Sequence, residues 1–161
     1  MATSIIDGTI EEANLKRSFW NMRVFDTVLI QRADGQVENL GKTIVEGNLA
    51  YHIVPGAAGR FYRYTTIDHR GIHGVRLDNG EEAYGFARNN EIASIFCILF
   101  GGALLAVYLL TGTMVTSWMW PLLLIGFVFL PFYWSARAAA WKQYAGDDGY
   151  VPPVPAQAAP V

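Results

Sequence analysis

The residues with the clearest chemical potential are Asp68, His69 and His73, which lie within the six-residue run DHRGIH. Imidazole nitrogens and carboxylate oxygens are ligands for Zn²⁺, which structural sites hold through four donors at about 2 Å. His52 or Glu82 would have to complete such a site from another part of the chain. The alternative is that Asp68 accepts bonds from turn N–H groups while the histidines face water. The run therefore gives a metal-binding hypothesis with an incomplete ligand set.

A second group of residues alternates basic and aromatic side chains. The run from Arg60 to Tyr64 reads RFYRY, and Arg70 follows it. Successive strand residues face opposite sides, so Arg60 and Arg63 would lie on different faces. A nucleic-acid stacking platform needs its aromatic and basic groups on one surface, which argues against nucleic acid as a partner. We expect Arg60, Arg63 and Arg70 to contact lipid headgroups or a partner protein, the alternative being ion pairs with nearby carboxylates.

Motifs for covalent or phosphate chemistry are missing from the sequence. It contains no GxSxG, HExxH or CxxC motif and no phosphate-binding P-loop. The net charge of −2 also excludes a strongly basic nucleic-acid binder. The single cysteine, Cys97, lies in an apolar run and has no partner for an internal disulfide. We predict that the protein is not an enzyme and needs no cofactor.

The elements that must hold these residues divide the chain into a polar part and an apolar part. No charged side chain lies between Glu91 and Arg137, whereas ten of the twelve Lys/Arg and twelve of the fourteen Asp/Glu lie in residues 1–91. Two runs, 92–110 and 118–134, are long and apolar enough for transmembrane helices. The short uncharged loop 111–117, predicted to be extracytoplasmic, makes them antiparallel neighbours.

The polar part has the pattern of a small β domain over residues 24–88. Short β-type runs alternate with the turn dipeptides DG, EG, PG and NG. The predicted strands are 24–31, 37–45, 48–54, 60–67, 74–77 and 82–86. They would form an antiparallel sheet or a partly closed barrel of SH3 or OB type. The predicted fold class is therefore membrane α+β, with a small cytosolic antiparallel β domain followed by a two-helix transmembrane hairpin.

The remaining segments lie at the two ends of the chain. Residues 1–23 form an N-terminal segment, either a short amphipathic helix suited to a membrane surface or a lead-in that packs Phe19 and Trp20 on the domain core. Residues 135–145 are predicted to be a juxtamembrane helix. Residues 146–161 are Pro/Ala-rich and are predicted to be a disordered tail.

Positive charges flank the predicted hairpin and set its orientation. Arg88 precedes the first helix, and Arg137 and Lys142 follow the second, whereas the loop has none. The positive-inside rule then places both termini in the cytoplasm, and the N-terminus lacks a signal-peptide pattern. We predict a multi-pass protein of the inner (cytoplasmic) membrane, although an organellar membrane satisfies the same physics. The tryptophans expected at the membrane interfaces are Trp118, Trp120, Trp134 and Trp141.

Small residues on the first helix, namely Gly101, Gly102 and Ala106, allow another helix to approach closely. That helix could be the second one of the hairpin or one from another protein. Neither span holds an ionisable residue, which argues against transport by this chain alone. We predict a non-catalytic accessory or scaffold subunit of a larger membrane complex of transport, secretion or respiratory type. Membrane lipid and other membrane-protein subunits are the expected partners, and a homo-oligomer is left open.

The alternative hypothesis belongs to a different class of protein. It is a membrane-tethered sensor or regulator whose cytosolic β domain binds a small ligand or a metal through Asp68, His69 and His73.

Overall fold

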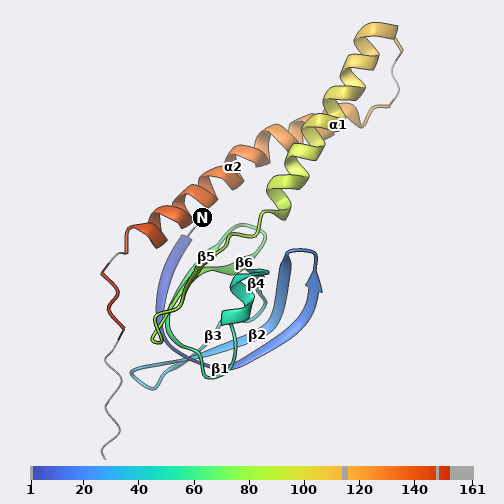
Figure 1. The fold of residues 1–161 in the computed structure, drawn as a ribbon. Helices are drawn as coiled ribbons and strands as arrows, with labels where there is room; N and C mark the ends of the chain where they lie inside the picture. Colours follow the sequence, from blue (N-terminus) through green and yellow to red (C-terminus); the bar gives the residue numbers. More distant parts are fainter. Residues whose placement is uncertain (1, 114–115, 148, 153–161) are drawn as a thin grey trace, which may run out of the picture. The chain divides into compact units, whose positions relative to one another are not determined.

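The computed structural model describes residues 2–113, 116–147 and 149–152. They form two compact units. One unit holds the chain up to Ala87 together with the described residues from Ala140 onward, and the other is Arg88–Ala139. The first unit is built on a curled β-sheet and the second on two long helices (Figure 1).

Within the described residues, the first unit contains seven strands and one short 3-10 helix, η1. Their bounds are β1 Ala2–Phe19, β2 Met22–Arg32, β3 Val37–Asn39, β4 Thr43–Glu46, η1 Leu49–His52, β5 Ala58–Thr65, β6 Arg70–Leu77 and β7 Glu82–Tyr84.

The sheet closes because β1 is long enough to pair with two neighbours. Its first half pairs with β5 and its second half with β2, both antiparallel. Gly8 lies at the junction and is paired with both Arg32 and Gly59. Since β2 pairs with β4, β5 pairs with β6, and β4 pairs with β6, the five strands return to their starting point. The polar domain is therefore a β-barrel.

The prediction of an antiparallel domain is wrong for one strand pair. β4 and β6 are parallel, joined through Ile44–Gly71 and Val45–Ile72. Parallel neighbours need a crossover connection, and here η1 and the whole of β5 supply it. The strand order β1–β2–β4–β6–β5, closed by β5 on β1, is the Greek-key connectivity of an OB-type barrel.

Several segments differ from their predicted secondary structure. The predicted strand 37–45 is split into β3 and β4, and the strand predicted at 74–77 begins at Arg70 as β6. The N-terminal segment forms β1 rather than a helix, and Phe19 and Trp20 are exposed instead of packed on the core. Its buried residues Ile6 and Ile10 are four apart, a spacing that puts side chains on one face in a strand as well as in a helix. Residues 48–54 contain η1 instead of a strand, and their buried side chains Leu49, Ala50 and Ile53 follow a helical spacing rather than alternating.

Apolar side chains from most of these elements fill the barrel. Leu49 of η1 is fully buried, as are Phe61 of β5 and Val75 of β6, so η1 and the strands share one core. The complete cluster is Ile6, Ile10, Phe25, Val28, Ile30, Leu40, Val45, Leu49, Ala50, Ile53, Phe61, Ile72, Val75 and Leu77.

The two predicted apolar helices are confirmed, as α1 Asn89–Thr111 and α2 Met119–Ala145. Both are long and apolar enough to cross a membrane by length and composition. α1 ends at Gly112, whose left-handed backbone lets its N–H bond the carbonyl of Tyr108. α2 continues through Pro131 and includes residues 135–145, so the predicted juxtamembrane helix is the continuation of the second apolar helix.

Candidate functional site

Two glycines bring α1 and α2 into close contact. A Cβ added to Gly101 would lie 2.9 Å from Cγ of Leu123, and one added to Gly126 would lie 2.4 Å from Cγ1 of Ile98. Larger side chains at either glycine would push the helices apart. Sequence analysis identified Gly101 but missed Gly126, which interrupts the bulky apolar run of the second helix and could have been found there.

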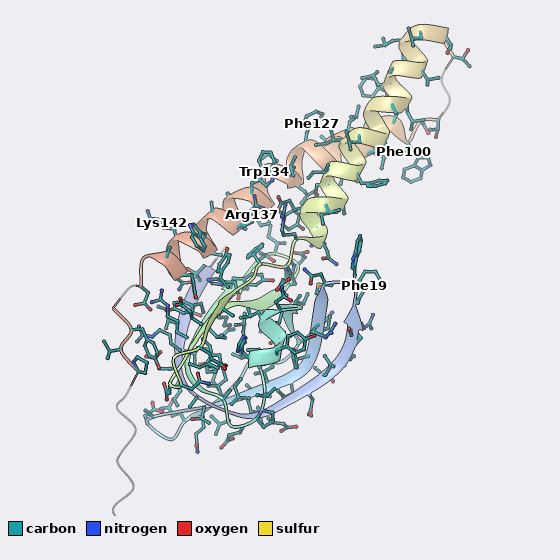
Figure 2. The ribbon with its side chains drawn as sticks, in the orientation of Figure 1. Phe19, Phe100, Phe127, Trp134, Arg137 and Lys142 are labelled. Atoms are coloured by element: carbon teal, nitrogen blue, oxygen red, sulfur yellow. The ribbon has the colours of Figure 1, made fainter. Side chains whose placement is uncertain are left out.

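The other predicted packing residues lie on a different side of α1. A Cβ added to Gly102 would meet no described heavy atom within 4 Å, and Ala106 is exposed. Large apolar side chains on both helices also face outward, such as Phe100 and Phe127, which Figure 2 shows pointing away from the helix pair. The hairpin contact therefore uses one part of the predicted small-residue set and leaves Gly102 and Ala106 open.

A buried carboxylate joins the two helices at one end of the hairpin. Glu91 is only 3% exposed, and one of its oxygens accepts a hydrogen bond of 2.9 Å from Nε1 of Trp134. The same oxygen lies 3.2 Å from Arg137 and 3.5 Å from Arg88. The two arginines offset the charge of Glu91, so the cluster has a structural explanation. Sequence analysis gave Glu91 no role, although it is the last acidic residue before the uncharged stretch.

The other predicted interfacial tryptophans have different surroundings. Trp118 and Trp120 lie next to and inside the first turn of α2 and are 69% and 55% exposed. The ring of Trp141 packs edge-to-face on Tyr84, with 4.9 Å between the ring centroids. Their placement at a membrane surface stays a prediction.

Two of the three predicted contact arginines form ion pairs within the barrel unit. Arg60 makes two hydrogen bonds to Asp7, of 2.7 and 2.8 Å. Arg63 bonds Glu38 at 2.8 Å. Arg70 is exposed and forms no ion pair with any residue that the structure describes. Arg60 and Arg63 are therefore paired with carboxylates of the barrel, as the alternative hypothesis expected. For Arg70, contact with a lipid headgroup or a partner protein stays a prediction.

The predicted metal ligands do not converge. Asp68 lies 2.8 Å from Nδ1 of His69, but His73 is enclosed by aromatic rings. The proposed additional ligands are engaged elsewhere, His52 with Glu81 and Glu82 with Arg76. Among the described residues, no group of three metal-ligating side chains could hold an ion. The structure therefore does not support the metal hypothesis.

His73 is instead part of an aromatic cluster on the outer face of the barrel. Its ring is fully buried, and the ring centroids of Tyr62, Tyr64 and Tyr84 lie 5.9 to 6.2 Å away. Burial lowers the pKa of His73 to about 4, and a hydrogen bond with the backbone of Ala140 opposes this shift. The histidine is therefore neutral at physiological pH.

The cluster is covered by the described residues between 140 and 152, which we call the C-terminal strap. The ring of Tyr144 meets that of Tyr62 edge-on at 5.1 Å. Gly74 leaves room for it, since an added Cβ there would be 2.5 Å from Cδ2 of Tyr144. Arg76 lies over the other side of Tyr144, 5.0 Å from the ring centroid.

Polar contacts hold the second half of the strap on the barrel. Asp147 accepts hydrogen bonds from the hydroxyl of Tyr62 at 2.7 Å and from Arg60 at 2.9 Å. These two groups lower the pKa of Asp147, the Tyr62 hydrogen bond first. The hydroxyl of Tyr150 donates to Asp78. The prediction of a disordered tail is therefore wrong for the described residues up to Pro152, and residues 153–161 lie outside the described part.

A shallow cavity lies at the β5–β6 turn. Its volume is about 350 Å³. The lining residues are Lys42, Ile44 and the run from Thr65 to Arg70. Lys42 and Arg70 are both exposed, and neither forms an ion pair with a described residue. The cavity therefore brings two exposed cations, Lys42 and Arg70, onto one surface.

No protein-family model, curated protein or solved structure matches this chain.

Proposed function

We propose that this chain is a non-catalytic integral membrane protein that acts as an accessory or scaffold subunit of a larger membrane complex. The complex would be of transport, secretion or respiratory type in the inner membrane, with both chain termini in the cytoplasm. The observation that carries the proposal is the open position at Gly102, beside the exposed Ala106. The contact within the hairpin already has its own glycines, Gly101 and Gly126.

Helix association in a bilayer depends on close packing, because lipid tails are as apolar as the side chains that they surround. A glycine inside a helix costs about 1 kcal/mol relative to alanine. Within the described chain, no close contact at Gly102 explains why a glycine is present there in spite of this cost. The most apolar windows of the two helices are only 11% and 22% buried, so most of their surface is left for lipid or another helix.

We expect that partner subunits no longer co-purify with the Gly102→Leu variant, although its helical hairpin stays intact. The added side chain would occupy the space that a partner helix needs, and its Cβ would have no described heavy atom within 4 Å. The measurement is purification of the full chain in mild detergent, with size-exclusion chromatography and mass spectrometry of what co-purifies.

Ala93→Leu is the matched control. Ala93 is also exposed and precedes Gly102 by nine residues, which places it about 180° away around the helix. The control should retain the partners that Gly102→Leu loses. Purification of the wild-type chain as a lone monomer would contradict the proposal.

A second candidate function is a membrane-tethered sensor of a small anion, favoured by the cavity that holds Lys42 and Arg70. We expect an anion as the ligand because Lys42 and Arg70, two cations without a described ion pair, line the cavity. His69 and His73 are not the basis of this expectation. The nearby carboxylate of Asp68 is bonded by Thr66 and His69, which limits its repulsion of an anion.

We expect inorganic phosphate or a nucleoside phosphate to raise the melting temperature of the full chain if this sensor function holds. A ligand at about 100 times its dissociation constant adds about 2.7 kcal/mol of stability. Arg70→Gln should abolish the rise, whereas Arg17→Gln, also exposed but outside the cavity, should retain it. An unchanged melting temperature with all anions would exclude the sensor.

A further inference from the structure

The end of the β1–β2 hairpin exposes large apolar side chains next to cations. Leu15, Phe19 and Trp20 are 54%, 60% and 85% exposed. Figure 2 shows Phe19 at the free end of this hairpin, outside the barrel. Together with Lys16, Arg17 and Arg23, these residues are here called the hairpin tip.

The backbone at the hairpin tip is fixed in an uncommon conformation. Trp20 has a φ of +48°, and among the described residues it is the one non-glycine with a positive φ. L-residues with large side chains rarely adopt this conformation, which favours glycine or asparagine. The next residue, Asn21, accepts a hydrogen bond of 2.8 Å from the N–H of Gly47, and its amide donates to Glu46. The turn is therefore held rigidly with an unfavourable residue at its centre.

Neither the turn nor the core accounts for a tryptophan at this position. Asparagine would suit the backbone better, and the Trp20 side chain is 85% exposed, so the core does not require it. Exposed aromatic residues of this kind indicate an external contact.

The charges around the tip suit an anionic surface. Arg17 is exposed and forms no ion pair with a described residue. Arg23 donates to the hydroxyl of Ser18, which leaves its charge uncompensated. Lys16 is paired with Asp26 at 2.7 Å. Three cations stand against the carboxylates of Asp26 and Glu46, so one positive charge is left beside the exposed rings of Phe19 and Trp20. Segments that bind the headgroup layer of membranes combine aromatic rings with positive charge in this way.

We infer that the hairpin tip docks on the headgroup layer of the bilayer that holds α1 and α2. Trp20 and Phe19 enter the interface, and Arg17 and Arg23 contact anionic headgroups. The inference rests on the membrane placement in the proposed function. Only residues 85–88 separate β7 from α1, so the tether keeps the tip at a high effective concentration near the membrane.

The test measures the depth of a spin label next to the tip in the full-length chain. Cys97 is the one cysteine, so Cys97→Ser gives a cysteine-free background. Ser18→Cys carries the label beside Phe19. Val37→Cys is the control label, because Val37 is 51% exposed and pairs with Gln31 near the other end of β2. Leu109→Cys, 72% exposed on α1, reports on membrane insertion itself.

The chain is reconstituted in vesicles of phosphatidylcholine with phosphatidylglycerol, and in vesicles of phosphatidylcholine alone. In the mixed vesicles, we expect the Ser18 label to be about tenfold less accessible to a water-soluble nickel chelate than the Val37 label. Phe19→Thr with Trp20→Asn should return it to the aqueous value, since asparagine fits the backbone of residue 20. Omitting phosphatidylglycerol should reverse part of the protection.

Three results would overturn the inference. An aqueous Ser18 label together with a lipid-exposed Leu109 label refutes docking and leaves the membrane placement standing. An aqueous Leu109 label refutes the membrane placement, and the inference with it. Protection of Ser18 that increases with the protein-to-lipid ratio indicates contact with a second copy instead of lipid.

Discussion

Acidification from about pH 7 to pH 4 should destabilise the wild-type chain by about 3 kcal/mol more than the variant His73→Phe. Burial lowers the pKa of His73 from 6.5 to about 4 in the folded chain. Between these two values the unfolded chain binds a proton that the folded chain does not. Stability therefore falls as the pH decreases through this window and levels off below it.

The groups around His73 support this interpretation. Burial raises the pKa of both Tyr62 and Tyr64, so these neighbours stay neutral throughout the acidic range. Burial is the larger influence on the pKa of His73 and the backbone of Ala140 opposes it, so protonation would place a charge in a buried site. Phenylalanine keeps the aromatic packing and has no proton to bind.

The measurement is the unfolding of the full chain in detergent at both pH values, for wild type and variant. His52→Gln is the control, because His52 is paired with Glu81 near the surface and lies outside the cluster. Nuclear magnetic resonance of the His73 ring provides a second readout and should show no titration above about pH 5. Equal pH slopes for wild type and His73→Phe would contradict the prediction.

Gly71→Ala should weaken closure of the barrel and lower the free energy of unfolding by about 3 kcal/mol. An added Cβ would lie 2.3 Å from the backbone oxygen of Ile44 and 2.5 Å from Cε1 of Tyr64. Ile44 is also the partner of Gly71 in the short parallel pairing of β4 with β6. The backbone oxygen cannot move aside without breaking this pairing, and Tyr64 is only 1% exposed.

Hydrogen exchange is the informative measurement for this variant. Protection should fall first in β4 and β6, while the amides of the β1–β2 pair stay protected. The control is Gly35→Asn, because Gly35 has a φ of +80° and open space around its Cβ position, which asparagine tolerates. If Gly71→Ala kept the wild-type free energy of unfolding and unchanged protection, the prediction would be wrong. β4 and β6 could then make room for the added Cβ without a loss of stability.

The sequence predicted the elements whose signal is local. The apolar helices follow from composition alone, and the turn dipeptides delimit strands such as β2 and β5 closely. Ile6 and Ile10 could not distinguish strand from helix, because a spacing of four satisfies both periods. The parallel pairing of Ile44 with Gly71 depends on contacts between distant segments, which no local pattern encodes.

At the candidate sites, too, the sequence indicated which residue types are present but not which of them meet in the folded chain. The small residues of α1 were identifiable, but whether Gly101 or Gly102 faces α2 depends on the rotation of one helix against the other. DHRGIH suggested a shared ligand set, yet strand geometry buries His73 away from Asp68 and His69. The strap was missed because its composition is that of a disordered tail, although Asp147 and Tyr150 precede the final Pro/Ala-rich residues.

The position of the strap in the chain has a consequence for biosynthesis. The barrel unit contains residues up to Ala87 and then resumes at Ala140. A ribosome makes the chain from the N-terminus, so both predicted spans, 92–110 and 118–134, are made before Tyr144 and Asp147. Until then Tyr62 lacks its contacts with the Tyr144 ring and the Asp147 carboxylate. The two spans are thus committed to their environment before the barrel acquires its final covering.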